Sequence, residues 1–380
     1  MIRTDRLSEA VNTYIEKLIL PSDPEHPLWN RESFIFSKPV KWNYIDNCMI
    51  RAVIMLYEQS GDERLLSYAD SFMRRYIDSD GNIPTLNPAD MNIDNFNGGR
   101  NLIFLHEKTG DERYRLAYEK LFSLLSVQPR LKCGNYWHKA VYPHQMWLDG
   151  AYMALPFETK YAVMNGSERL LGDVCAQLGS FRSIMRDSAT GLYYHGYDES
   201  RTQKWADSAT GLSGEFWLRS MGWLCAGLAD VTEEAPEDSK LRETSASMLC
   251  ELLDALAARL NPDGMLDQLP YRQGLEGNYT ETSGTLLFAY SAMKAYRLGA
   301  ADEKLFAAGR DALLAVTDKF IVRSSDGLPI LKNICLMAGL GGQPYRDGSA
   351  DYYLSERITE NDAKGIAPYL MAYTEIINEM

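Results

Sequence analysis

The sequence predicts an all-α protein built as an (α/α)6 barrel, in which six outer helices enclose six inner helices. Three observations support this prediction. A helix with one polar face recurs along the chain, each copy follows a helix that is apolar on most sides, and strand signals are few and short. No proline-rich or low-complexity segment interrupts the series, so we expect residues 1–380 to form one domain.

The predicted outer helices share a start signal. GDERLL, GDERYR and GSERLL each place a glycine before an Asp or Ser cap, with a Glu in the first turn. Apolar residues then recur at three- and four-residue steps, which leaves one face of each helix polar. Including weaker copies, the six segments begin at about Leu7, Gly61, Gly110, Gly166, Glu237 and Ala301.

The predicted inner helices are richer in apolar and small residues, with Gly, Ala and Ser at interior positions. This composition is typical of helices that neighbours pack closely on several sides. The six ranges are about 42–58, 92–108, 145–164, 214–231, 279–298 and 359–378. An open helical solenoid is the alternative architecture, which the unequal spacing of the repeats disfavours.

The composition restricts the partners and the location of the protein. Its formal net charge is −13, and it contains no basic run, so we expect no nucleic-acid partner and no membrane binding. The N-terminal segment lacks a long apolar stretch, which predicts neither a signal peptide nor a transmembrane span and suggests the cytoplasm. The six cysteines are scattered without CxxC spacing, which is typical of reduced core thiols.

Polar and aromatic residues gather where the inner helices begin. If these helices run in one direction around the ring, their N-terminal ends share one mouth. Helix capping explains many single Asp, Asn and Thr residues there, but it does not explain the recurrence of Trp42, Trp147 and Trp217. Aromatic faces stack on sugar rings and polar groups bind hydroxyls, so the pattern predicts a sugar-binding cleft.

Asp94 and Asp149 are the candidate catalytic carboxylates. Asp149 lies in MWLDGAYMALPF, an apolar stretch that predicts a helix over residues 146–157. A buried carboxylate is paired, protonated or facing a cleft. We expect the apolar neighbours to raise the pKa of Asp149, and Asp94, between Asn92 and Asn95, to stay ionised more easily. The alternative for Asp149 is a structural role as an internal cap or ion-pair partner.

Three further candidates lie in predicted loops, and one lies in a helix. His138 and Lys139 in NYWHKAVYPHQ, and His195 in GLYYHGYD, are either functional or structural hydrogen-bonding residues. Arg219 in FWLRSMGW either meets a substrate carboxylate or belongs to a structural ion pair. Neither HxxxH nor HExxH occurs, so the sequence predicts no metal site and no cofactor.

Six stretches, spread over nearly the whole chain, carry a family resemblance. They are WNYIDNCM, NIDNFNGGRNLIFLHEKTGDERY, YWHKAVYPHQMWLDGAYMALPF, GLYYHGYDES, EFWLRSMGWLCAGL and SADYYLSERITENDAKGIAPYLMA. The chain resembles glycoside hydrolase family 105, the unsaturated rhamnogalacturonyl hydrolases, and more distantly family 88, the unsaturated glucuronyl hydrolases. These families have the (α/α)6 fold, in agreement with the repeat pattern.

The resemblance implies a small pectin-derived oligosaccharide substrate with a 4,5-unsaturated uronic acid at its non-reducing end. An Asp protonates C4 of the double bond, water adds at C5, and the hemiketal opens to release the next sugar. By resemblance, Asp149 is the acid and then the base, and Asp94 holds ring hydroxyls and helps to set the charge of Asp149. Positions that match substrate-binding residues are His195, Trp217 and Arg219, with Tyr44, His138 and Lys139 in similar loops.

Two other classes of function remain open. A sugar epimerase of the same barrel shape uses histidines as acid and base, and the low number of histidines at the inner-helix ends disfavours it. A non-catalytic sugar-binding toroid would keep the cleft without the chemistry.

Overall fold

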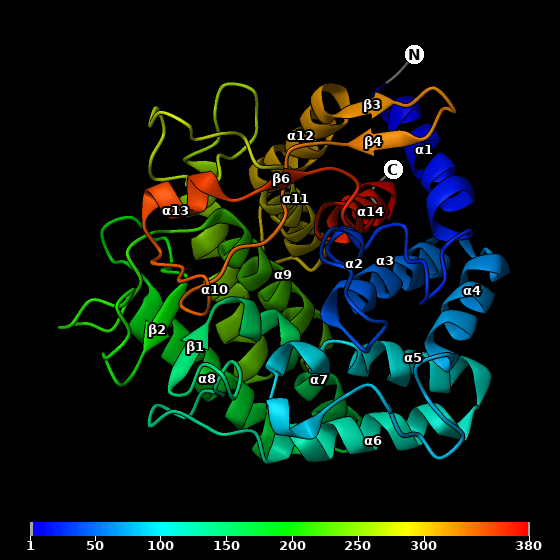
Figure 1. Ribbon diagram of the computed structural model, residues 1–380, viewed down its shortest axis with the longest axis horizontal. Coiled ribbons are helices and arrows are strands. Elements are labelled where there is room, and N and C mark those ends of the chain that lie inside the picture. Colours follow the sequence, from blue (N-terminus) through cyan, green and yellow to red (C-terminus); the bar gives the residue numbers. More distant parts are fainter. Residues whose placement is uncertain (1–2, 379–380) are drawn as a thin grey trace.

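The computed structural model describes residues 3–378, and helices dominate them (Figure 1). All twelve predicted barrel helices are present. The inner helices are α3 (Tyr44–Ser60), α5 (Gly99–Thr109), α7 (Asp149–Met164), α9 (Leu218–Glu234), α11 (Thr282–Arg297) and α14 (Ala363–Asn378). The outer helices are α1 (Arg3–Tyr14) with its π-helical continuation η1 (Ile15–Ile19), α4 (Glu63–Arg74), α6 (Glu112–Ser126), α8 (Glu168–Met185), α10 (Lys240–Ala257) and α12 (Glu303–Phe320).

The inner helices form a closed ring. Each inner helix packs on the next in chain order, and α14 closes the ring by packing on α3. Each outer helix from α4 to α12 packs on the inner helix that precedes it in the chain, and α1 packs on α14. Two of them also contact the next inner helix, α10 on α11 and α12 on α14. In Figure 1, α1, α4 and α6 follow the periphery of the molecule, with α3 and α14 inside them. The predicted (α/α)6 barrel is confirmed, and the open solenoid is wrong.

Glycines allow the inner helices to approach one another closely. A Cβ atom added to Gly227 of α9 would lie 3.1 Å from backbone atoms of Tyr152 in α7. A Cβ atom added to Gly284 of α11 would lie 2.4 Å from the side chain of Leu218 in α9. The small residues predicted for the inner helices therefore mark their contact surfaces.

The outer helices begin at the predicted caps. The side chains of Asp62, Asp111 and Ser167 each accept a hydrogen bond from a backbone N–H in the first turn of α4, α6 and α8. Gly61 and Gly110 end the preceding inner helices with φ of 68°, a conformation that glycine adopts without strain. These local signals explain why the outer helices are readable from the sequence.

The remaining elements lie between the barrel helices. The short helices are α2 (Arg31–Phe36), α13 (Ala350–Ser355) and the 3-10 turns η2 (Pro88–Asp90) and η3 (Ile93–Phe96). Three antiparallel pairs are formed by β1 (Gln145–Trp147) with β2 (Gly196–Asp198), β3 (Ile321–Arg323) with β4 (Pro329–Leu331), and β5 (Ile334–Cys335) with β6 (Ile358–Thr359). Among residues 3–378, no helix is long and apolar enough to span a membrane.

The predicted helix over residues 146–157 is wrong at its beginning. Met146 and Trp147 belong to strand β1, where Met146 lies opposite Tyr197 of β2, and α7 begins at Asp149. Asp149 therefore lies in the first turn of α7 and not in the middle of a helix. A carboxylate in this position is favoured by the helix dipole. The predicted helix 92–108 is likewise divided, into η3 and α5.

Candidate active site

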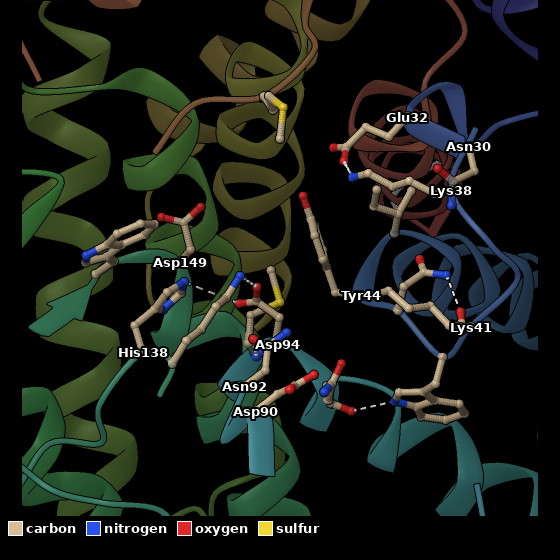
Figure 2. Close-up of a pocket in the computed structure, with 18 of the residues that line it drawn as sticks. Asn30, Glu32, Lys38, Lys41, Tyr44, Asp90, Asn92, Asp94, His138 and Asp149 are labelled. Carbon is tan, nitrogen blue, oxygen red and sulfur yellow. Dashed lines mark hydrogen bonds and ion pairs between the residues drawn. The ribbon is translucent and has the colours of Figure 1, made fainter. Parts of the chain in front are cut away.

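One cavity, of about 250 Å³, opens where α3, α7 and α9 begin (Figure 2). All the predicted site residues except His195 line it, namely Tyr44, Asp94, His138, Lys139, Trp147, Asp149, Trp217 and Arg219. Figure 2 shows the ring of Tyr44 between the group around Asp94 and the Glu32–Lys38 ion pair. Of the six predicted helix starts, those near Tyr44, Asp94, Asp149 and Arg219 therefore meet at this cavity, whereas no residue at the starts of α11 and α14 lines it.

Asp94 is held in an ion pair. The Asn92 side chain caps η3 and fixes Asp94 on the cavity wall. Oδ2 of Asp94 lies 2.7 Å from Nζ of Lys139, and Oδ1 lies 3.6 Å from Nε2 of His138. Burial lowers the pKa of Lys139, but its contact with Asp94 outweighs burial and raises the pKa overall. Asp94 and Lys139 therefore line the cavity as an ion pair whose charges neutralise each other.

His138 is uncharged at neutral pH and packs on Trp147. Burial lowers the pKa of His138 to about 4, although Asp94 opposes the change. The rings of His138 and Tyr142 both stack on Trp147, with centroid distances of 4.4 and 4.7 Å. Only 5% of Trp147 is exposed, so protein rings already occupy much of the surface that was predicted to stack on a sugar.

Asp149 has a histidine as its nearest partner. Its Oδ2 lies 3.3 Å from Nε2 of His195, within ion-pair distance, and neither atom has a hydrogen-bond partner among residues 3–378. Burial raises the pKa of Asp149, but the contact with His195 outweighs burial, so the pKa is lowered overall. The prediction of a raised pKa is therefore wrong, because it considered the apolar wall and missed His195. The Asp149 side chain is still 17% exposed, which leaves it accessible from the cavity.

His195 lies behind Asp149 and does not line the cavity. It is fully buried just before β2. Its Nδ1 lies 2.7 Å from the hydroxyl of Tyr353 in α13, and its ring packs on Trp217 with a centroid distance of 4.7 Å. His195 is thus placed to support Asp149 from the protein side, whereas the sequence predicted contact with substrate.

Arg219 is a buried cation that forms no ion pair among residues 3–378. It lies in the first turn of α9, is 2% exposed and lines the cavity. Its Nη1 donates hydrogen bonds to the carbonyl of Cys335 and, at 3.4 Å, to the hydroxyl of Ser283. No Asp or Glu oxygen of the described chain lies within 4.0 Å of its guanidinium. The structural ion pair considered as an alternative is therefore not found.

Sequence reasoning missed some residues that line the cavity, among them Arg346 and Glu32. The Arg346 guanidinium donates hydrogen bonds to the Tyr142 hydroxyl at 2.7 Å and the Gly341 carbonyl at 2.8 Å. Glu32 of α2 lies 2.8 Å from Nζ of Lys364 in α14. These residues come from a loop and a short helix that no repeat marks, and Tyr142 and Lys364, which they contact, are far away in the sequence. No local signal could have grouped them.

The described residues contain no group of three or more His, Cys, Asp or Glu side chains that could hold a metal ion. All six cysteines are free.

Comparisons with known proteins match most of the chain to glycoside hydrolases. The profile of Glycosyl Hydrolase Family 88 matches residues 25–380. A solved C. acetobutylicum ATCC 824 glycoside hydrolase from family 105 is 36% identical, over 92% of this chain and 98% of that chain, with a TM-score of 0.87. Protein Atu3128 of Agrobacterium fabrum is 40% identical over 232 residues, which are 59% of this chain and 97% of that protein.

A more distant relative carries a named activity. The unsaturated rhamnogalacturonyl hydrolase YesR of Bacillus subtilis is 26% identical over 200 residues, which are 51% of this chain and 54% of that protein. The profile match covers nearly the whole barrel, and the family 105 structure shares its fold at substantial sequence identity. This chain therefore belongs to the glycoside hydrolases of the related families 88 and 105.

Proposed function

We propose that the protein releases a 4,5-unsaturated uronic acid from the non-reducing end of small pectin-derived rhamnogalacturonan oligosaccharides. The observation that carries the proposal is Arg219, a buried guanidinium that lines the cavity and has no carboxylate oxygen within 4.0 Å among residues 3–378. An unsaturated uronate would bring that carboxylate, and a planar guanidinium can bind it through two parallel N–H···O bonds. The likeness to YesR, whose name gives the same activity, supports this choice of substrate.

Asp149 performs the proton transfers in the proposed reaction. Protonated Asp149 donates its proton to C4 of the enol ether, and positive charge develops at C5 and the ring oxygen. The Asp149 carboxylate then takes a proton from a water molecule as that water bonds to C5. The resulting hemiketal opens to a keto-uronate and releases the next sugar. Asp149 ends the cycle protonated, as it began.

Substrate binding supplies the protonated state of Asp149. His195 lowers the pKa of Asp149 and so favours the ionised carboxylate before substrate binds. A substrate carboxylate bound at Arg219 adds negative charge to the cavity and displaces water, and both changes raise the pKa of Asp149. Lys139 already neutralises Asp94, so the Asp94 carboxylate is free to accept hydrogen bonds from the sugar hydroxyls. Tyr44, His138, Trp147 and Trp217 complete the proposed walls of the site.

The first experiment follows the ultraviolet absorbance of the alkene–carboxylate in the unsaturated disaccharide produced by rhamnogalacturonan lyase. We expect the purified protein to abolish this absorbance. In Asp149→Asn, turnover should fall by about 10²–10⁴-fold, because the variant lacks the acid and base. Asp238→Asn, in the exposed loop before α10, is the control and should keep wild-type activity.

A panel of substrates separates the remaining alternatives. Loss of absorbance only with unsaturated glucuronyl disaccharides would assign the chain to unsaturated glucuronyl hydrolysis instead. If neither class of disaccharide reacts, the proposed hydrolase function is overturned. Binding without turnover would then favour the sugar-binding toroid.

A further inference from the structure

We infer that Tyr353 is a positioning residue that fixes the tautomer of His195, so that the Nε2–H group of the imidazole faces Asp149. The inference deepens the proposed function and rests on it, because it concerns the proton that Asp149 transfers. Tyr353 itself does not line the cavity, so it acts only through His195.

Three side chains form a line of contacts that runs from the cavity into the protein. Oδ2 of Asp149 lies 3.3 Å from Nε2 of His195, and Nδ1 of His195 lies 2.7 Å from the hydroxyl oxygen of Tyr353. His195 and Tyr353 are both fully buried. Water therefore does not compete for either ring nitrogen, and the protein alone decides where the imidazole proton lies.

The fold holds Tyr353 firmly in this line. It belongs to α13, which begins where the Ser349 side chain accepts a hydrogen bond from the Tyr352 backbone N–H. Trp217 stacks on the Tyr353 ring with a centroid distance of 5.9 Å and an interplanar angle of 22°. The Gln268 side chain also donates a hydrogen bond to the Tyr353 carbonyl at 3.2 Å.

Tyr353 donates the hydrogen bond to His195. Burial raises the pKa of Tyr353 well above its ordinary value, so the phenol keeps its proton. In the described part of the chain, Nδ1 of His195 is the one acceptor within hydrogen-bond distance of this hydroxyl. A buried O–H group without an acceptor is unfavourable, so the phenol points its hydrogen at Nδ1.

The tautomer of His195 follows from this donation. An imidazole whose Nδ1 accepts a hydrogen bond carries its single proton on Nε2. That N–H group faces Oδ2 of Asp149 and stabilises the carboxylate. A second proton on His195 would occupy Nδ1 and leave the Tyr353 hydroxyl without an acceptor. Tyr353 therefore disfavours the imidazolium, which would hold Asp149 ionised even after substrate binds.

Other charged groups near the line have partners of their own. Glu215, which precedes α9, lies 2.7 Å from Arg272, and the Arg346 guanidinium donates to the Gly341 carbonyl. His138 is largely neutral because burial lowers its pKa to about 4. Asp149 and Tyr353 are thus the groups in direct hydrogen-bonding or ionic contact with the His195 nitrogens.

The test is the variant Tyr353→Phe, which keeps the ring that packs on Trp217 and removes only the hydroxyl. His195 can then take up a second proton and hold Asp149 ionised. We expect kcat to fall by about tenfold or more, with KM changed little, and the high-pH limb of the kcat profile to move to lower pH.

Tyr193→Phe is the matched control. Tyr193 is also fully buried, and its hydroxyl has no hydrogen-bond partner among residues 3–378. This variant should keep the wild-type kcat and pH profile. If Tyr353→Phe also keeps them, the inference is overturned. Equal losses of activity in the two variants, with no shift of the pH profile, would overturn it as well, since they would indicate packing alone.

A direct measurement separates this inference from the proposed function. Nitrogen-15 NMR of histidine-labelled protein reports which ring nitrogen of His195 carries the proton, without any substrate. We expect protonated Nε2 and unprotonated Nδ1 in the wild type, and loss of this preference in Tyr353→Phe. A proton on Nδ1 of the neutral wild-type ring overturns the inference. An inactive protein with the expected tautomer would overturn only the proposed function.

Discussion

Asp94 and Asp149 share one cavity but differ in their partners. Lys139 lies 2.7 Å from Asp94, whereas Asp149 lies 3.3 Å from an imidazole and, among residues 3–378, within 4.0 Å of no Lys or Arg nitrogen. The charge of Asp149 is therefore the more sensitive of the two to a ligand. At the scale of single residues, this difference separates a group suited to binding from one suited to proton transfer.

The sensitivity of Asp149 predicts different pH profiles for kcat/KM and kcat. The pH profile of kcat/KM reports the free protein, in which His195 lowers the pKa of Asp149. The pH profile of kcat reports the enzyme–substrate complex, in which the substrate carboxylate is proposed to raise the pKa of Asp149. Because the proposed first step requires protonated Asp149, each profile should fall as pH rises through the corresponding pKa. We expect kcat to persist to higher pH than kcat/KM in initial-rate measurements. Coincident high-pH limbs would contradict the coupling of protonation to binding.

The proposed contact between Arg219 and the substrate carboxylate predicts that activity requires a guanidinium at position 219. Arg219→Lys keeps the positive charge but loses the planar pair of donors, so we expect kcat/KM to fall by about 10²-fold. Arg310→Lys, on α12 with a side chain that is 43% exposed, is the control. Steady-state kinetics on the unsaturated disaccharide checks both variants. A lysine variant with wild-type kcat/KM would show that Arg219 does not bind the carboxylate.

The interface between helices α7 and α8 contains a carboxyl group that is neutral at physiological pH. Glu158 of α7 is buried, and burial together with nearby Asp173 raises its pKa to about 8 from an ordinary value of 4.5. Tyr136 donates a hydrogen bond to it at 3.1 Å. Between these two pH values, the folded protein retains a proton that the unfolded chain releases. The free energy of unfolding therefore decreases as pH rises through this interval.

Glu158→Gln tests this pH dependence. The amide cannot ionise, so the variant should lose less thermal stability than the wild type between about pH 4.5 and 8. Thermal unfolding followed by circular dichroism at several pH values is the measurement. Parallel curves of Tm against pH for the two proteins would show that Glu158 is ionised in the folded state.

The elements also show how far sequence reasoning reaches. The outer helices were predictable because their caps and apolar spacing are local, as in the segment that begins at Gly61. The start of α7 was not, because a short apolar run fits a buried strand as well as a buried helix. Strand β1 exists because β2 pairs with it from about fifty residues further along the chain. The same limit hid the partners of Asp149, since His195 meets Tyr353 across 158 positions.

At the scale of the whole molecule, the ring depends on close packing between inner helices. Gly227→Ala places a methyl group 3.1 Å from the backbone of Tyr152, which cannot move without shifting α7. We expect a loss of about 1–3 kcal/mol of stability in urea unfolding. Gly172→Ala in α8 is the matched control: its methyl group enters open space, so it should raise stability by about 0.5–1 kcal/mol. A stabilising effect at both positions would contradict the packing argument.

The ring is closed by contacts between the two ends of the described chain. Glu32 meets Lys364 across 332 positions, and the Tyr14 hydroxyl meets the Asn361 side chain across 347. We call these contacts between the two ends of the described chain the seam of the ring. Glu32 lines the cavity, so the seam is part of the site as well as part of the fold. The interpretation of the chain as one domain stays a prediction that agrees with this arrangement.

The seam also determines when, during its synthesis, the protein can first act. Asp94 and Asp149 are translated well before Tyr353 and Lys364, and long-range contacts form late in folding. A nascent chain that already contains both carboxylates still lacks the phenol behind His195 and the lysine beside Glu32. Activity is therefore expected to begin only after translation of α14, as the last helix joins the first.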